Sequence, residues 1–247
     1  MKDLKYTNTK PKGILLSIEG LQKTGKTEFG LSLPAPLFVL DLNLGLEGVI
    51  EKHVGKKDLY VKRIQIPYTA SLPGAGFTVL ATAASEKWRE AILTLNEAIK
   101  DDTIRSIFVD TGSELWDLLR IARLGKLTQV LPVQYAAVNA EFRQLLQILL
   151  SCGKNVVLSH KVKPEYVNDQ RTNRFERAGF GDVGFDVQVE IRTERDLKKE
   201  GDDQFSINVM DCRANKNLKG STLTGKDCQF LKLVTQIYPN TTEEDWA

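Results

Sequence analysis

The chain has 247 residues, of which 42% are hydrophobic and 27% are charged, and its formal net charge is +2. This length suits one α/β domain with at most a small appendage, and the composition is ordinary for a globular protein. A charge this close to zero excludes a strongly basic or acidic protein, so any basic surface must be local. The sequence shows neither a membrane-spanning stretch nor the apolar core of a signal peptide, which predicts a cytoplasmic protein without membrane contact.

Cysteine and histidine are scarce, and their spacing excludes several kinds of site. Cys152, Cys212 and Cys228 are odd in number and none belongs to a C-x-x-C pair, so we expect reduced thiols. Only two histidines occur, His53 and His160, which excludes a histidine-rich metal site.

The first predicted elements surround a phosphate-binding loop. Residues 1–12 are polar and contain several lysines, and we expect a flexible lead-in there. Residues 13–19 are mostly apolar and predict a short strand, whereas residues 28–33 can open a helix that Pro34 stops. Residues 20–27 between them match G-x-x-x-x-G-K-[ST], the phosphate-binding pattern, in the strand–loop–helix context that it requires.

This loop predicts a nucleotide site with ATP and Mg²⁺ as ligands. Gly20 and Gly25 allow the backbone to take positive φ, so that successive N–H groups can meet the phosphates at a helix N-terminus. Lys26 is predicted to reach the β- and γ-phosphates, and the hydroxyl of Thr27 to bind Mg²⁺. The predicted nucleotide-binding residues are Gly20, Leu21, Gln22, Lys23, Thr24, Gly25, Lys26, Thr27 and Glu28.

Strands and helices alternate after the loop. Continuous apolar runs predict buried strands, and apolar residues at helical spacing predict amphipathic helices. The predicted strands are residues 37–41, 59–66, 106–111 and 155–160, and the predicted helices are residues 83–100, a segment capped by Ser113, and a segment from about Val138 to Gly153. Repetition of this order predicts a parallel sheet with right-handed crossovers.

The pattern changes after His160. Residues 161–184 are polar and basic without a clear period, and we expect an irregular loop. Apolar and polar residues then alternate over 187–191 and again over 205–209, which predicts an antiparallel hairpin with one wet face. The last segment, residues 239–247, is acidic and predicts a mobile tail.

A phosphate loop needs a carboxylate that holds the magnesium shell, and two predicted strands end in one. Residues 107–110 have the Walker B form, hydrophobic residues followed by an aspartate, so Asp110 is the preferred metal residue together with Thr27. Asp41, at the end of the strand over residues 37–41, is the alternative. Asp110 can also serve as a cap of the following helix.

Five segments of the chain follow one another in a recognisable order, namely residues 18–27, 37–41, 107–111, 156–160 and 211–216. In that order they resemble the compact phage-type P-loop ATPases with a RecA-like core, some of which are similar to single-strand annealing recombinases. The resemblance implies one RecA-like P-loop ATPase domain over residues 13–238, with a mostly parallel sheet that ends in the antiparallel hairpin. It also implies a homo-oligomer in the cytoplasm of a bacterial host.

The resemblance places an activating glutamate after the second strand, usually as Asp-x-Glu. This chain has Asn43 in place of the glutamate. Glu47 is either its substitute or a solvated loop charge. Without such an acid, hydrolysis should be slow, because an unactivated water must attack an anionic phosphorus.

Other catalytic residues are implied in the same way. His160 ends the fourth core strand and is either a γ-phosphate sensor or a structural histidine. Arg213 and Lys216 either reach the nucleotide of a neighbouring subunit, where positive charge stabilises the transferring phosphoryl group, or are ordinary surface residues. The implied catalytic set is Lys26, Glu47, His160, Arg213 and Lys216.

In RecA-like filaments the loop after the sensor strand contacts single-stranded DNA. The corresponding segment here interleaves cations with aromatic residues, as sequence-independent strand binding requires, although Glu165, Asp169 and Glu176 dilute the charge. The alternative is a solvated loop. The candidate DNA-binding residues are Lys161, Lys163, Arg171, Arg174, Phe175 and Arg177.

These features favour an ATP-binding, single-strand-stimulated ATPase that acts in DNA recombination, annealing or replication, with a single-strand-binding or replication protein as a possible partner. The alternative is a nucleotide-gated binding module that hydrolyses poorly and regulates a protein partner. The missing Asp-x-Glu acid supports the alternative, whereas the basic and aromatic segment supports the ATPase. A metabolic kinase ranks lower, because no arginine-rich lid is evident.

Overall fold

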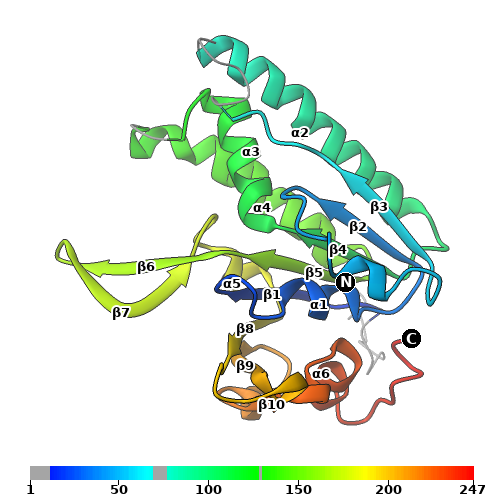
Figure 1. Ribbon diagram of the computed structural model, residues 1–247. Coiled ribbons are helices and arrows are strands. Elements are labelled where there is room, and N and C mark those ends of the chain that lie inside the picture. The colour runs from blue at the N-terminus through cyan, green and yellow to red at the C-terminus, as the bar shows by residue number, and fades with distance from the viewer. Residues whose placement is uncertain (1–11, 69–76, 128–129) are drawn as a thin grey trace, which may run out of the picture.

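The computed structural model describes residues 12–68, 77–127 and 130–247, which fold as a mixed α/β structure around one large sheet (Figure 1). Apart from Lys12, the flexible lead-in predicted for residues 1–12 lies outside the described residues. Among the helices of the described part, none is long and apolar enough to cross a membrane.

Eight strands form the large sheet, and two more form a separate pair. The strands of the sheet are β1 (Leu15–Gly20), β2 (Leu37–Asp41), β3 (Leu59–Arg63), β4 (Ser106–Asp110), β5 (Asn155–His160), β8 (Val189–Arg195), β9 (Phe205–Cys212) and β10 (Thr222–Thr224). The separate pair is β6 (Val162–Val167) and β7 (Gln170–Arg177).

The helices are α1 (Lys26–Leu31), α2 (Phe77–Lys100), α3 (Gly112–Leu124), α4 (Tyr135–Ser151), α5 (Val183–Asp186) and α6 (Phe230–Ile237). Short 3₁₀ turns are η1 (Ile50–Lys52), η3 (Pro132–Gln134), η4 (Gly201–Gln204), η5 (Lys216–Leu218) and η6 (Gly225–Asp227).

The order of the strands confirms the predicted class, a P-loop NTPase fold with a mostly parallel sheet. Neighbouring strands follow the order β10-β9-β8-β1-β5-β4-β2-β3, and the six from β8 to β3 are parallel. Strands β9 and β10 extend the β8 edge in antiparallel fashion, so the predicted hairpin of residues 187–191 and 205–209 is present as β8–β9. Strand β5 lies between β1 and β4, which brings the phosphate loop and Asp110 to the same edge of the sheet.

Helices cover both faces of the sheet, which explains why its central strands read as continuous apolar runs. Strands β1, β2, β4 and β5 are buried along their whole length. Helices α2, α3 and α4 lie on one face, where Trp116 and Phe142 pack, and α1 and α6 lie on the other with Phe29 and Phe230 (Figure 1). The sheet is therefore a fixed frame for the loops that leave its carboxyl edge.

The prediction of an irregular loop over residues 161–184 was wrong, because this segment contains the β6–β7 hairpin and the beginning of helix α5. Figure 1 shows the hairpin projecting away from the sheet. Asn168 and Asp169, with φ of 50° and 60°, form its two-residue turn, a left-handed conformation that these residue types tolerate. Both strands are largely exposed, so they lack the apolar alternation that reveals a strand in a sequence.

The prediction that Ser113 caps the following helix was also wrong. Thr111 is the N-cap of α3, and its hydroxyl accepts a hydrogen bond from the Glu114 backbone N–H at 3.1 Å. The Ser113 hydroxyl instead donates to the carbonyl oxygen of Ala178 at 2.6 Å and accepts from the Lys161 N–H at 3.0 Å. Ser113 therefore ties α3 to both ends of the β6–β7 hairpin.

The mobile tail expected over residues 239–247 is packed in the structure. Trp246 is 3% exposed within the core that contains α6, and its ring stacks on Tyr238 with the ring centroids 5.2 Å apart. The indole N–H donates to the Thr241 hydroxyl at 2.8 Å. The prediction of a mobile tail rested on the acidic composition of the segment and did not take account of Trp246, whose buried ring anchors it.

Candidate nucleotide-binding site

The phosphate loop joins the carboxyl end of β1 to the N-terminus of α1. Gly25 is the N-cap residue of α1 with a φ of 98°, and Lys23 also has a positive φ of 59°. A Cβ atom on Gly20 would lie 2.3 Å from the hydroxyl oxygen of Thr193, so a larger residue would collide there. Backbone turns with such φ values create concave sets of N–H groups that hold anions. The loop thus has the geometry that phosphate binding requires.

Lys26 lies folded over this loop. Its Nζ donates hydrogen bonds to the carbonyl oxygens of Gly20 at 2.9 Å and of Leu21 at 2.5 Å. Burial lowers the pKa of Lys26, and the negative charge of Asp110 opposes that shift. An ammonium that is partly stripped of water beside loop carbonyls is positioned to move onto an incoming phosphate.

Asp110 ends β4 beside the phosphate loop, at the place that the sequence predicts. Its carboxylate accepts hydrogen bonds from the Thr27 hydroxyl at 3.0 Å and from the Ser159 hydroxyl at 2.6 Å. The side chain is almost completely buried, and burial raises its pKa, whereas these two hydrogen bonds and the charge of Lys26 lower it. Ser159 escaped the sequence analysis, although its place next to His160 at a strand end was a usable signal.

Asp41 occupies the neighbouring strand end, directly opposite Asp110 in the register of β2 and β4. It is fully buried, and Arg63 Nε lies 3.4 Å from its Oδ2. Burial raises the pKa of Asp41, and the neighbouring carboxylate of Asp110 raises it further. Two carboxylates and the Thr27 hydroxyl are the hard oxygen donors that Mg²⁺ prefers, so the residues present fit this ion.

Glu47 lies on the loop after β2 with 71% of its side chain exposed. Its Oε1 is 3.6 Å from Arg63 Nη1, so Arg63 stands between Glu47 and the buried Asp41. Glu47 and Gly45 line the cavity in front of the phosphate loop. The predicted substitute acid is thus near the loop, and Arg63 is a contact that the sequence did not reveal.

His160 is fully buried, and within the described residues neither ring nitrogen has a hydrogen-bond partner. Burial lowers the pKa of His160 well below its usual value, and the charge of Arg177 lowers it further. Its side chain packs against Gly112, where a Cβ atom would lie 2.6 Å from His160 Cε1. This environment favours the structural alternative for His160 over a γ-phosphate sensor.

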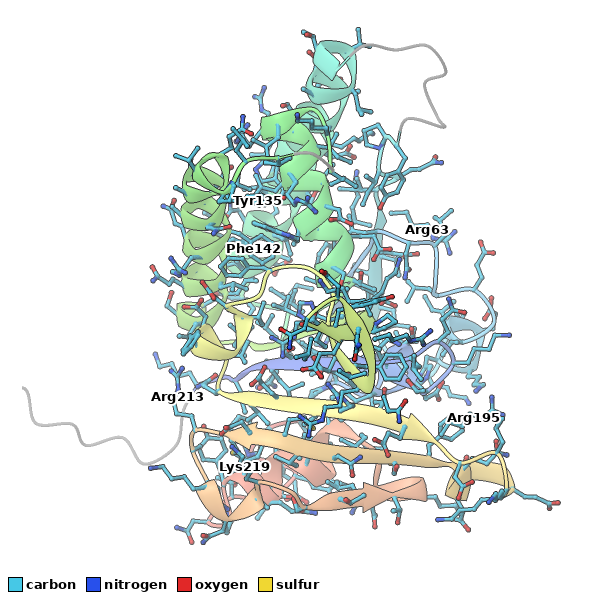
Figure 2. The ribbon with its side chains drawn as sticks, turned by 90° about the vertical axis from the view of Figure 1, so that its left-hand side faces the viewer. Arg63, Tyr135, Phe142, Arg195, Arg213 and Lys219 are labelled. Carbon is cyan, nitrogen blue, oxygen red and sulfur yellow. The ribbon has the colours of Figure 1, made fainter. Side chains whose placement is uncertain are left out.

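Arg213 and Lys216 lie at the opposite edge of the sheet from the phosphate loop. Strand β9 is antiparallel, so its end at Cys212 meets the beginning of β8 at Val189, whereas Gly20 pairs with Thr193 further along β8. The four residue-to-residue steps from Val189 to Thr193 span roughly 13 Å. Figure 2 shows Arg195 at one end of these strands and Arg213 at the other. The structure does not bring Arg213 or Lys216 to the phosphate loop of the same chain.

A cavity of about 880 Å³ opens in front of the phosphate loop. This volume lies in the range that small-molecule sites occupy. One wall is the exposed side of α1, a second is the loop after β2 with η1, and a third is the end of β8 with the start of β9. The lining residues include Thr24, Lys26, Thr193, Arg195, Phe205 and Cys228.

The candidate DNA-binding cations fall into two groups on the β6–β7 hairpin. Arg171 and Arg174 are exposed along β7, and the ring of Phe175 is half-buried. Lys163 is exposed but paired with Glu176 at 3.1 Å. These residues are the exposed or half-buried candidates on the two strands of the hairpin.

Arg177 and Lys161 form the second group, which is engaged at the base of the hairpin. Arg177 is mostly buried, with its Nε 3.2 Å from a Glu19 carboxylate oxygen and a further ion pair to Glu190. Lys161 forms an ion pair with the buried carboxylate of Glu114. Arg177 therefore holds the hairpin to β1 and β8, and the sequence alone did not separate such a structural cation from a free one.

A family model described as an AAA domain matches residues 12–199, roughly three quarters of the chain. The chain belongs to this AAA-domain family. The family is one of P-loop NTPases, so this AAA-domain protein is a nucleotide-binding protein of an ATPase family. A search of curated proteins gives no match. Strands β9 and β10 and helix α6 lie beyond the matched residues.

The position of Lys26 leads to the first prediction. Lys26→Ala should abolish ATP binding and leave the fold intact, because the hydrogen bonds that its side chain donates within the described residues go to two loop carbonyls. Calorimetric titration with Mg·ATP measures the affinity, and thermal unfolding checks the fold. Lys100→Ala, an exposed lysine on α2, is the matched control. If the Lys26→Ala variant is folded and binds ATP with unchanged affinity, Lys26 does not contribute to the nucleotide site.

The two neighbouring carboxylates lead to the second prediction. Asp110→Asn should reduce the Mg²⁺-dependent part of ATP affinity by about 10- to 100-fold, because the hydrogen-bonded carboxylate beside Thr27 orients the metal shell. Asp41→Asn is the matched control and should have the smaller effect. The measurement is ATP titration with Mg²⁺ and with EDTA. A larger effect of Asp41→Asn would assign the metal to β2.

Proposed function

We propose that this protein is a Mg²⁺-dependent ATPase that single-stranded DNA stimulates and that acts in recombination, annealing or replication. The observation that carries the proposal is the direct structural connection between the phosphate loop and the β6–β7 hairpin. Lys26 and Thr27 hold the triphosphate and Mg²⁺, and Asp110 holds the metal shell. The protein acts as a homo-oligomer, in which Arg213 and Lys216 face a neighbouring subunit, with a single-strand-binding or replication protein as partner.

The connection runs through two strands that end beside the phosphate loop. Ser159 on β5 donates to Asp110, and two residues later Lys161 leads into β6. Glu19 on β1 directly precedes Gly20 and pairs with Arg177 at the end of β7. A shift of the loop on nucleotide binding therefore acts on both ends of the hairpin.

Arg192 on β8 strengthens the same connection. Its Nε and Nη2 both donate to a Glu19 oxygen, at 2.9 and 2.5 Å, and Nη2 also donates to the Phe175 carbonyl oxygen at 3.0 Å. Charge-assisted bonds of this kind are shorter and stronger than neutral ones. The hairpin base is thus held by the strand that enters the phosphate loop.

The outer part of the hairpin has the chemistry of a single-strand surface. Tyr166 is 61% exposed and lies opposite Arg171 in the register of β6 and β7, and Pro164 lies opposite Phe175. Paired residues of an antiparallel ladder share a face. Cations that bind phosphates beside aromatic rings that stack bases bind strands without sequence preference.

Glu47 is the acid that orients the attacking water in this proposal, with Arg63 holding it near Asp41. Its exposure and the asparagine at position 43 make hydrolysis slow. The second candidate function, a nucleotide-gated module that regulates a protein partner, rests on the same two observations. The measured rate of ATP hydrolysis distinguishes the DNA-stimulated ATPase from the nucleotide-gated module.

Phosphate release with and without single-stranded DNA is the third prediction and tests the function. DNA should raise the rate, and Glu47→Gln should lower it by about 100-fold or more without weakening ATP binding, because general bases contribute about 10²–10⁴. Glu51→Gln, an exposed glutamate in η1, is the control. Tight ATP binding without turnover at any DNA concentration would favour the nucleotide-gated module.

The exposed arginines of β7 give the fourth prediction. Replacing Arg171 and Arg174 by alanine should reduce the slope of log affinity against log salt by about 1.4, at about 0.7 per phosphate contact on a single strand. A labelled oligonucleotide titrated at several salt concentrations measures the slope. Alanine at the exposed Lys198 and Lys199 removes the same charge elsewhere and should leave it unchanged. An unchanged slope in the variant that lacks Arg171 and Arg174 would show that DNA does not bind on the hairpin.

A further inference from the structure

The cavity extends beyond the phosphate loop to a pair of side chains that the proposed function leaves without a role. Arg195 at the end of β8 and Phe205 at the start of β9 are direct partners in the antiparallel register. The Arg195 guanidinium carbon lies 5.5 Å from the centre of the Phe205 ring. Gln204 fixes this arrangement, because its Oε1 accepts from Arg195 Nε at 2.9 Å.

This pair borders the phosphate loop directly. A Cβ atom on Gly25 would lie 3.4 Å from Phe205 Cδ1, which is ordinary van der Waals contact. On the same wall, Thr193 lies two residues before Arg195, and its hydroxyl is 2.7 Å from the hydroxyl of Thr24 in the loop. A ligand whose phosphates occupy the loop therefore has Phe205 as an immediate neighbour.

Phe205 is half-buried and lines the cavity, unlike the fully buried aromatic residues of the core such as Phe230. The next inward-facing residue of β9, Ile207, completes the apolar part of this wall, and Cys228 lies behind it, with Sγ 3.5 Å from the Phe205 carbonyl oxygen. A flat aromatic ring with an arginine over it offers a π surface to a planar group. The nucleoside base is the planar part of the ligand that the phosphate loop holds.

We infer that Phe205, with Arg195 beside it, is the surface on which the base of the bound nucleotide stacks. The inference rests on nucleotide binding at the phosphate loop, as proposed above. It assigns an affinity-determining residue to β9, outside the residues 12–199 that the family model covers. Stacking uses the face of a base and is tolerant of its identity, so Phe205 contributes to ATP and GTP binding alike.

The test compares nucleotides with tripolyphosphate, which has the phosphates but no base. In calorimetric titrations with Mg²⁺, Phe205→Ala should raise the Kd of ATP and of GTP by about 5- to 150-fold, the range of base–aromatic stacking. The Kd of tripolyphosphate should stay unchanged. Phe205→Tyr keeps the ring and should retain the affinity of the unaltered protein. Phe185→Ala removes a phenylalanine that is 80% exposed on α5 and is the control.

Phe205→Leu keeps apolar volume without the ring, and it replaces Phe205→Ala in the same comparison if the alanine variant does not fold. Equal losses for ATP and tripolyphosphate would show that Phe205 only supports the loop, and would overturn the inference. Unchanged ATP affinity would place the base elsewhere, with the proposed function intact. If the unaltered protein bound neither ATP nor tripolyphosphate, the proposed function would fall, and the inference with it.

Discussion

The buried carboxylate of Asp110 is the constraint around which the site is built. Removing a charge of this kind from water costs several kcal/mol unless partners replace the lost solvation. The hydroxyls of Thr27 and Ser159 supply two hydrogen bonds, at roughly 1.5–3 kcal/mol each for bonds to a charged group, and Asp41 adds a second buried carboxylate beside it. Burial raises the pKa of both acids, because it disfavours their charged forms. Asp110, Asp41 and the Thr27 hydroxyl are the groups that would hold a divalent cation, whose charge would offset this loss of solvation.

The frame that holds Asp110 could be predicted from the sequence, because its causes are local. Strands covered on both faces read as apolar runs, and the phosphate loop has a fixed spacing of glycine, lysine and threonine. The contacts that complete the site could not be predicted in the same way. Arg63 and Thr193 come from distant segments, and only the strand order brings them to the loop. Trp246 and the β6–β7 hairpin were missed for a related reason, since tertiary packing and a two-residue turn determine them.

The cations of the hairpin show why charge in a sequence underdetermines function. Arg171 and Arg177 look equivalent in the sequence, six positions apart in one basic segment. In the structure Arg177 lies among Glu19 and Glu190, and removing it would leave two partly buried carboxylates with one cation fewer. Loss of one partner from a buried pair costs about 3–5 kcal/mol. Arg177 therefore has a structural role, and the exposed arginines of β7 are the ones available to the DNA that we propose as a partner.

Strands β1 and β8 each contribute residues both to the base of the β6–β7 hairpin and to the surroundings of the phosphate loop. At its carboxyl end each strand presents one residue to each face of the sheet: Glu19 and Arg192 hold the hairpin, while Gly20 and Thr193 shape the phosphate loop. The alternation of side chains along a strand makes this possible, because adjacent residues point to opposite faces. Neither face can shift at these positions without moving the backbone that the other face depends on. In the proposed function, these shared strands, together with β5 between the phosphate loop and Asp110, are the structural connection between the nucleotide site and the hairpin.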